Sequence, residues 1–123
     1  MKLLIVDDSL VIRNKINRNL LNQFESVNRA SNGVDALSIV KTDPPGFVTI
    51  ALTMPEMDGV ECIEEIMKIA PNTYILVISA LADKATAVKA LTLGANGFLC
   101  KPFTESQLND AIEKILGLEL YNE

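Results

Sequence analysis

Four short apolar segments, each about as long as a buried strand, recur along this chain and restrict what it can fold into. They lie at residues 3–6, 47–52, 74–78 and 97–100. Near-continuous apolar runs of this length are typical of strands covered on both faces by helices. The spacing therefore predicts an α/β fold built on a largely parallel sheet.

Helical periodicity fills the stretches between these segments. Ile12, Ile16, Leu20 and Phe24 recur every four residues, which predicts one buried helical stripe, with polar residues such as Arg13 facing away. The same reasoning predicts a short strand near 27–30 and helices at about 34–40, 60–69, 84–93 and from 105 onward.

Turn and capping signals mark the ends of these helices. Residues 43–46, Asp-Pro-Pro-Gly, are expected to stop the second helix, and Gly94 is expected to end the fourth in a left-handed cap. Thr104 and Gln107 have the spacing of a capping box at the start of the last helix. Five strand-helix units result.

Five such units with right-handed crossovers favour a doubly wound (βα)5 domain with strand order 2-1-3-4-5. A chain of 123 residues, 49% of them hydrophobic, forms one domain, predicted to span 1–123. Ligands of this fold sit outside the carboxyl ends of strands one and three. We therefore expect the functional site at that edge.

Charge and composition exclude several classes of function. The net charge of −5 argues against binding to nucleic acid or to anionic membranes, so the expected partner is a protein. The two cysteines have no metal or redox spacing, and no leader or membrane span is recognisable, which favours the cytoplasm. Without any histidine, the chain can hold neither an imidazole base nor a Ser-His-Asp triad.

The residues at the carboxyl ends of the predicted strands carry the chemistry. Asp7 and Asp8 follow the first strand, Ser79 the fourth and Lys101 the fifth. Two acids, a hydroxyl and an ammonium could hold a divalent metal and a phosphoryl group. The third strand delivers Ala51, where a carboxylate nucleophile would be expected, so the site lacks the group that would react.

Short motifs at the same positions resemble those of one family. They are V-D-D-S at 6–9, M-P at 54–55 with M-D-G at 57–59, S-A at 79–80 and K-P-F at 101–103. The chain resembles, from end to end, a response-regulator receiver domain of the CheY type, which has the flavodoxin-like doubly wound fold. In that family an aspartate three residues before Met-Pro takes a phosphoryl group from a phosphohistidine. That position is Ala51 here.

The resemblance implies roles for the acid pair. Asp8 would bind Mg²⁺ directly, Asp7 would act mainly through water, and Thr53 would supply a backbone carbonyl ligand. An adjacent acid pair suits Mg²⁺, which keeps several waters. The alternative is that Asp8 or Ser9 only caps the first helix.

Three more roles follow from the resemblance. Lys101 would contact the phosphoryl oxygens, aimed by a cis peptide bond to Pro102. Ser79 would be the switch hydroxyl that moves onto the phosphoryl group, and Phe98 the aromatic residue whose rotamer reports the active state. If the resemblance is set aside, Lys101 is interpreted as a solvated lysine before a turn, Ser79 as an ordinary turn residue and Phe98 as a half-buried core residue.

Ala51 then limits the expected activity. A methyl group can neither attack phosphorus nor bind a metal, so we expect no acyl phosphate and weak or absent Mg²⁺ binding. Lys101, without its nearest partner, is expected to lean toward Asp7 or Asp8. The otherwise intact site favours an engineered Asp→Ala change, and a natural pseudo-receiver that binds its partner without phosphate is the alternative.

We therefore expect a stand-alone receiver of a two-component phosphorelay that docks and is not an enzyme, with chemotaxis as the default pathway. Its partners would be a sensor histidine kinase or phosphotransfer protein and a downstream target. The target would contact the face of the fourth helix, fifth strand and fifth helix, which carries Lys84, Lys89, Phe98, Phe103 and Gln107. A haloacid-dehalogenase-type phosphohydrolase would need D-x-D, and in a flavodoxin-like carrier Asp7 and Asp8 would repel a phosphate.

Overall fold

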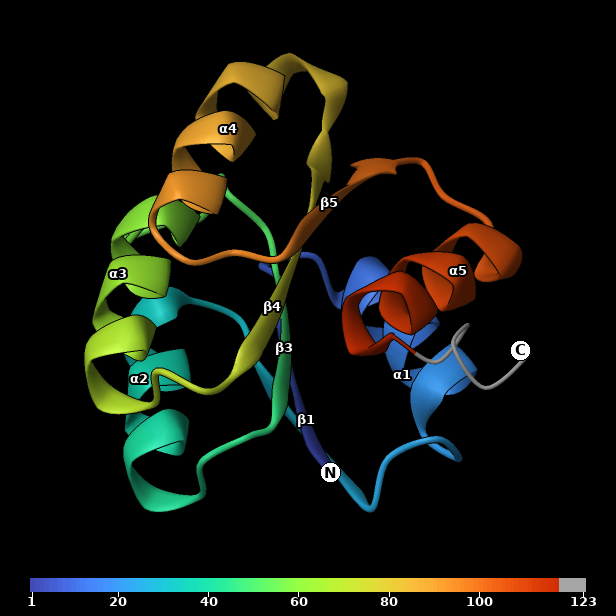
Figure 1. Cartoon of the computed structure of the whole chain (residues 1–123), viewed down its shortest axis with the longest axis horizontal. Coiled ribbons are helices and arrows are strands. Elements are labelled where there is room, and N and C mark those ends of the chain that lie inside the picture. Colours follow the sequence, from blue (N-terminus) through green and yellow to red (C-terminus); the bar gives the residue numbers. More distant parts are fainter. Residues whose placement is uncertain (118–123) are drawn as a thin grey trace.

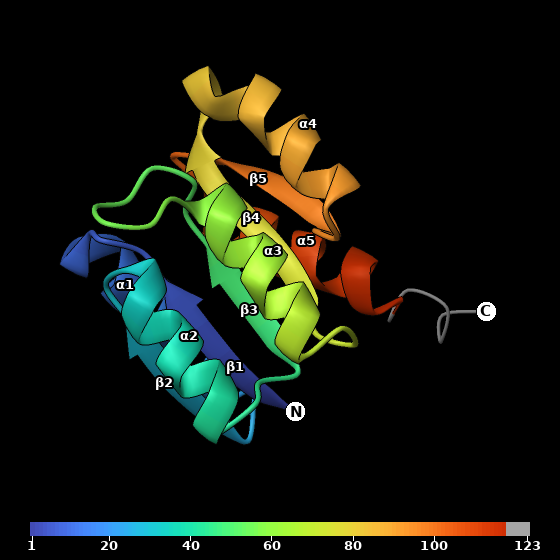
Figure 2. The same ribbon diagram turned by 90° about the vertical axis from the view of Figure 1, so that its left-hand side faces the viewer.

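The computed structural model describes residues 1–117 and contains five parallel strands and five α-helices in alternation (Figure 1). The sheet has the predicted strand order, β2-β1-β3-β4-β5 (Figure 2). In chain order the elements are β1 (Lys2–Val6), α1 (Leu10–Leu20), β2 (Ser26–Ala30), α2 (Gly33–Thr42), β3 (Phe47–Ile50), α3 (Gly59–Ile69), β4 (Tyr74–Ala80), a 3₁₀ turn (Leu81–Asp83), α4 (Lys84–Thr92), β5 (Gly97–Lys101) and α5 (Glu105–Leu116).

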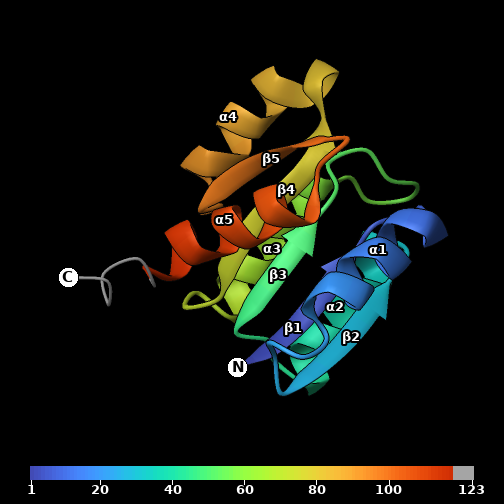
Figure 3. The same cartoon turned by 90° about the vertical axis from the view of Figure 1, so that its right-hand side faces the viewer.

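Helices cover the sheet on both faces, as the continuous apolar strands predict. Figures 2 and 3 show α2, α3 and α4 on one face and α1 with α5 on the other. Along β1, Leu4 and Val6 face the first layer while Leu3 and Ile5 face the second, and all four side chains are at most 1% exposed. Burial of each such side chain contributes about 1.5–3 kcal/mol, which explains why residues 3–6 of this strand are all apolar.

Side-chain caps and turns place the helix ends close to their predicted positions. Ser9 caps α1 by accepting a hydrogen bond from the amide of Ile12. Thr104 and Gln107 form the predicted capping box of α5, with distances of 3.1 and 2.9 Å. Gly94 lies two residues past the end of α4, after the C-cap Leu93, and has a φ of 126°, a backbone conformation that glycine adopts without steric cost.

Two expected boundaries are wrong. α1 ends at Leu20, so Phe24 lies beyond the helix in the connection to β2, where its ring packs against Phe47 at 5.9 Å between centroids. Periodicity cannot distinguish this non-helical contact from a further helical turn. β3 ends at Ile50, so Ala51 and Leu52 are buried but lie past the strand.

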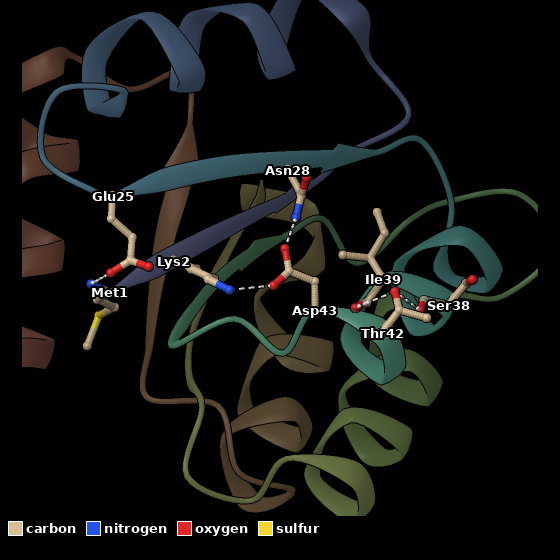
Figure 4. Close-up of polar contacts among 8 residues, drawn as sticks. All are labelled: Met1, Lys2, Glu25, Asn28, Ser38, Ile39, Thr42 and Asp43. Carbon is tan, nitrogen blue, oxygen red and sulfur yellow. Dashed lines mark hydrogen bonds and ion pairs between the residues drawn. The ribbon is translucent and has the colours of Figure 1, made fainter.

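The amino-terminal end of the sheet is held by polar contacts around Asp43, which follows α2. Its carboxylate pairs with the Lys2 ammonium at 2.6 Å and accepts a hydrogen bond from the Asn28 amide at 3.0 Å (Figure 4). The terminal ammonium of Met1 lies 3.3 Å from Glu25. This network joins β1, β2 and the end of α2 at the edge opposite the candidate site.

The predicted domain runs to residue 123, and its segment 118–123 lies outside the described residues. Among residues 1–117, no helix is both long and apolar enough to cross a bilayer.

Candidate functional site

The carboxyl ends of β1 and β3 lie side by side, as the predicted strand order requires. The amide of Ala51 donates to the carbonyl of Val6 at 3.0 Å, which places Ala51 next to Asp7. On the other side of β1, the amide of Asp7 donates to Ala30 of β2 at 3.1 Å. The expected grouping of Asp7 with Ala51 at this edge is therefore confirmed.

Asp7 is the buried charge of the site. Its side chain is 1% exposed, and Oδ2 lies 2.8 Å from Nζ of Lys101, the last residue of β5. Oδ1 accepts a hydrogen bond from the amide of Ser9 at 2.9 Å. A buried carboxylate needs such partners, because an unpaired one would cost several kcal/mol. Of the two partners considered for Lys101, the structure thus selects Asp7.

Lys101 reaches Asp7 across β3 and β4, which separate β5 from β1 in the sheet. The peptide bond between Lys101 and Pro102 is cis, as the resemblance implies. The Lys101 side chain keeps 24% of its area exposed, so its ammonium is at the mouth of the site and not inside the core.

Ser79 lies inside β4, one residue before its end, and is 3% exposed. Its Oγ accepts a hydrogen bond from the amide of Leu52 at 3.0 Å. The carbonyl of Leu52 in turn accepts a hydrogen bond from the amide of Gly59 at 2.8 Å. The segment that follows β3 is therefore held from β4 and from the start of α3.

Ala51 and Gly59 are in close backbone contact. A Cβ atom built on Gly59 would collide with the carbonyl oxygen of Ala51 and would lie 2.7 Å from Cα of Leu52. Only a residue without a side chain fits there. The M-D-G motif therefore has a steric reason in addition to the Asp58 cap, whose carboxylate accepts from the amide of Glu61 at 2.9 Å.

The remaining predicted site residues lie around this centre with fewer contacts. Asp8 is exposed, and Thr53 is exposed with its hydroxyl 3.5 Å from Oδ1 of Asp83. Phe98 is half-buried and packs against the core layer of α2, α3 and α4. The structure therefore groups Asp7, Lys101, Ser79 and Ala51, whereas Asp8 faces solvent.

The residues present do not make a good magnesium site. Both carboxylate oxygens of Asp7 already have protein partners, and Ala51 contributes no ligand atom. Within residues 1–117 there is no cluster of three or more histidine, cysteine or acidic side chains that could hold a metal ion.

The sequence prediction missed the contribution of Arg13. The polar residues of α1 were expected to face away, yet Nη1 of Arg13 donates to the backbone carbonyl of Asp7 at 2.6 Å. A backbone acceptor has no signature in the sequence. The contact supports the Asp7 loop from the side of α1.

A doubly wound five-strand domain with a buried aspartate, a serine and a lysine at its carboxyl edge is the arrangement expected of a receiver domain. Residues 3–113 match the response regulator receiver domain family. The chain belongs to this family.

Named relatives agree with that assignment. The chain is 38% identical over 116 residues to the chemotaxis protein CheY of Thermotoga maritima, covering 93% of this chain and 96% of that protein. It superposes with a TM-score of 0.87 and 28% identity on a chain of the CheX-CheY-BeF3-Mg²⁺ complex of Borrelia burgdorferi, covering 94% and 89% of the two chains. A receiver domain protein of Clostridium thermocellum gives a TM-score of 0.84 at 27% identity, covering 99% and 98%.

Proposed function

We propose that this chain is a receiver of a two-component phosphorelay that cannot be phosphorylated and that signals by docking, not as an enzyme. Position 51 is the phosphoacceptor position in this proposal. One observation carries it: Ala51 follows β3 beside Asp7, while Lys101 and Ser79 converge on the same edge. The groups that would orient a phosphoryl group are present, and the nucleophile is a methyl group.

The polar groups of the site are satisfied without a phosphoryl group. The Lys101 ammonium is neutralised by Asp7, and the Ser79 hydroxyl is occupied by the amide of Leu52. A phosphoryl group would have to displace both contacts without forming a covalent bond. This arrangement supports a receiver held in one state.

Receiver domains in general bind Mg²⁺, and we propose that this chain does so weakly or not at all. Loss of the carboxylate at position 51 and the pairing of Asp7 with Lys101 leave Asp8 and the carbonyl of Thr53 as the remaining candidate ligands. Mg²⁺ dehydrates reluctantly and favours one or two carboxylates, so a lone exposed acid gives little affinity.

The partners in this proposal are a sensor histidine kinase or phosphotransfer protein and a downstream target, in the cytoplasm. Receivers act with such proteins, and a CheX-CheY complex is among the similar structures. The CheY relatives make chemotaxis the proposed pathway.

We place the target on the face formed by α4, β5 and α5. Leu81, Val88 and Leu91 are 66%, 57% and 43% exposed on and before α4. A cavity of about 390 Å³ lies between β5 and α5 and is lined in part by Phe98 and Gln107. Exposed apolar side chains that gather on one element are typical of a protein contact site.

Phe103 does not contribute to this face. It is 3% exposed, and the ammonium of Lys15 lies 4.2 Å from its ring centroid and donates to its carbonyl. The expectation that Phe103 contributes to docking was therefore wrong, because the residue turns into the core between α1 and α5.

Ala51 has two possible origins, an engineered substitution and a natural pseudo-receiver sequence. An engineered Asp→Ala change explains why the rest of the site is intact. A natural pseudo-receiver explains why Lys101 and Asp7 satisfy each other without an acid at position 51. We favour the engineered origin.

Incubation with a small phosphodonor and Mg²⁺, followed by intact-mass spectrometry, tests the proposal. The chain should show no phosphoryl adduct, whereas Ala51→Asp should gain one, because Lys101 and Ser79 are already at the same edge. Ala51→Asn is the matched control, since it restores the side-chain size without a nucleophile.

Two outcomes would contradict the proposal. A stable adduct on the unmodified chain would show that another residue accepts the phosphoryl group. Failure of a folded Ala51→Asp variant to react, with its fold verified by circular dichroism, would show that position 51 is not the acceptor position.

A further inference from the structure

An open cleft lies beside β2, outside the candidate site. It is formed by the amino-terminal half of α1, the end of β2 and the first turn of α2, and its volume is about 450 Å³. This volume falls within the range of small-molecule sites, roughly 300–1,000 Å³. The lining residues are Leu10, Arg13, Asn14, Arg29, Ala30, Ser31 and Asp35.

Two of the three arginines of this acidic chain line this one cleft. Arg13 gives one donor to the carbonyl of Asp7, and Nη1 of Arg29 donates to Oδ1 of Asn14 at 3.3 Å. Each guanidinium has five N–H donors, so most of them remain available. Among residues 1–117, neither guanidinium forms an ion pair with a carboxylate within 4.0 Å.

Two guanidinium groups without acid partners in one concave site favour an anion. Their planar forks match the oxygens of phosphate and carboxylate groups, and such charge-assisted hydrogen bonds are about twice as strong as neutral ones. The Ser31 hydroxyl and the Asn14 amide offer further hydrogen bonds on the same wall, while Leu10 and Ala30 provide apolar contact.

We propose that this cleft binds a small dianion, carrying phosphate or carboxylate groups, between Arg13 and Arg29. Two negative charges suit two guanidiniums. Arg13 and Arg29 are not reacting groups of the candidate site, so this anion site does not depend on whether position 51 is the phosphoacceptor position.

Asp35 is the one carboxylate on the wall of the cleft. Its Oδ2 accepts a hydrogen bond from Nδ2 of Asn32 at 3.1 Å, and the residue lies in the first turn of α2. Its charge opposes an incoming anion. Removing that charge should therefore tighten binding, which gives the proposal a test opposite in sign to the loss of an arginine.

Arg13 connects the cleft to the candidate site. The same side chain that lines the cleft donates to the carbonyl of Asp7, whose carboxylate binds Lys101 and the amide of Ser9. An anion that reorients Arg13 should therefore shift the amide resonance of Ser9 as well as those of the cleft.

Titration of the ¹⁵N-labelled chain at pH 8 with inorganic phosphate, and separately with succinate, tests the site with two dianions at an ionic strength held constant with sodium chloride. We expect saturable shifts at the amides of Leu10, Asn14, Ala30 and Ser31. Arg29→Gln should weaken binding about tenfold or more, because it removes one positive charge and its charge-assisted hydrogen bonds to the anion. Asp35→Asn should tighten it about two- to fivefold.

Arg18→Gln is the matched control, because Arg18 is exposed on α1, the helix that carries Arg13, and does not line the cleft. It should leave the affinity unchanged. Saturation by inorganic phosphate alone assigns a phosphate ligand, and saturation by succinate alone assigns a carboxylate ligand. No saturable shift with either anion, or equal weakening by Arg18→Gln and Arg29→Gln, would overturn the proposal.

Discussion

Ser79 has a structural task at the residue scale in addition to the switch role that the family suggests. Ser79 is 3% exposed, and its hydroxyl is the acceptor for the amide of Leu52, a residue that is itself 3% exposed. Water has little access to this amide. The hydroxyl therefore couples the segment after β3 to β4 in the absence of any phosphoryl group.

Ser79→Ala should lower the free energy of unfolding by about 1–3 kcal/mol, because it leaves a buried amide without an acceptor. Urea unfolding followed by circular dichroism measures the change. Ser38→Ala, at an exposed position of α2, is the control and should stay within about 0.5 kcal/mol of the parent. Equal stability of Ser79→Ala and the parent would mean that water replaces the hydroxyl.

Cys62 shows how burial and nearby charges set the chemistry of a side chain. Burial, helped by the nearby charges of Glu61 and Asp58, raises the pKa of this thiol from 9.0 to about 12. The thiolate is the reactive form of cysteine. Cys62 is therefore inert in the native protein.

A Cys100→Ser variant leaves Cys62 as the one thiol of the chain and should show no fast reaction with a thiol reagent at pH 8 until denaturant is added. Because folding raises this pKa, the contribution of the neutral thiol to stability is complete below pH 9.0 and is lost as the pH rises toward about 12. Rapid labelling of the native variant would contradict the burial of Cys62.

At the scale of elements, α2 and α3 both begin with a glycine. Only at Gly59, the first residue of α3, does contact with backbone atoms exclude a side chain. A Cβ on Gly59 would lie 2.7 Å from Cα of Leu52, whereas a Cβ on Gly33 would meet the flexible side chain of Met57 at 3.0 Å. A side chain can move aside, and a buried backbone segment cannot do so without disturbing the site.

Gly59→Ala should therefore destabilise the protein by about 1–3 kcal/mol, the usual cost of inserting extra atoms in a packed region. Gly33→Ala, the matched helix-start control, should cost less. Thermal unfolding by calorimetry measures both. If the two variants unfold together, the close approach between α3 and the segment after β3 does not constrain residue 59.

At the scale of the whole molecule, polar contacts hold the two ends of the sheet differently. The carboxyl end uses the buried Asp7 with Lys101, and the amino end uses Asp43 with Lys2, whose side chains are each 41% exposed. The Lys2 hydrogen bond, followed by that of Asn28, lowers the pKa of Asp43 below 3.8. The Asp43 hydrogen bond raises the pKa of Lys2 above 10.5.

A lowered carboxyl pKa contributes stability above the unfolded value near 3.8, and this stability is lost as the pH falls through the folded value. Asp43→Asn should therefore unfold at a lower temperature than the parent at pH 7, and the difference should shrink below pH 3.8. Asp110→Asn on α5 is the control. A difference that stays constant with pH would exclude this ionic contribution.

Periodicity and apolar runs predicted the elements, their order and the edge that holds the site, because burial on both sheet faces demands those patterns. The same local reasoning predicted the N-cap at Thr104 and the positive φ at Gly94, because a hydroxyl suits an N-cap and glycine suits a positive φ. The failures at Phe24, Leu52 and Phe103 are residues whose apolar character is right but whose position depends on non-local packing.

The sequence by itself determined that position 51 carries no nucleophile, because the chemistry of a side chain does not depend on the fold. The tertiary structure alone decided that Lys101 pairs with Asp7 and not with Asp8, that Arg13 supports the Asp7 loop and that Ser79 holds Leu52. These contacts join residues from different elements and use backbone groups that every residue shares. Only the folded chain can therefore show which partner each side chain takes.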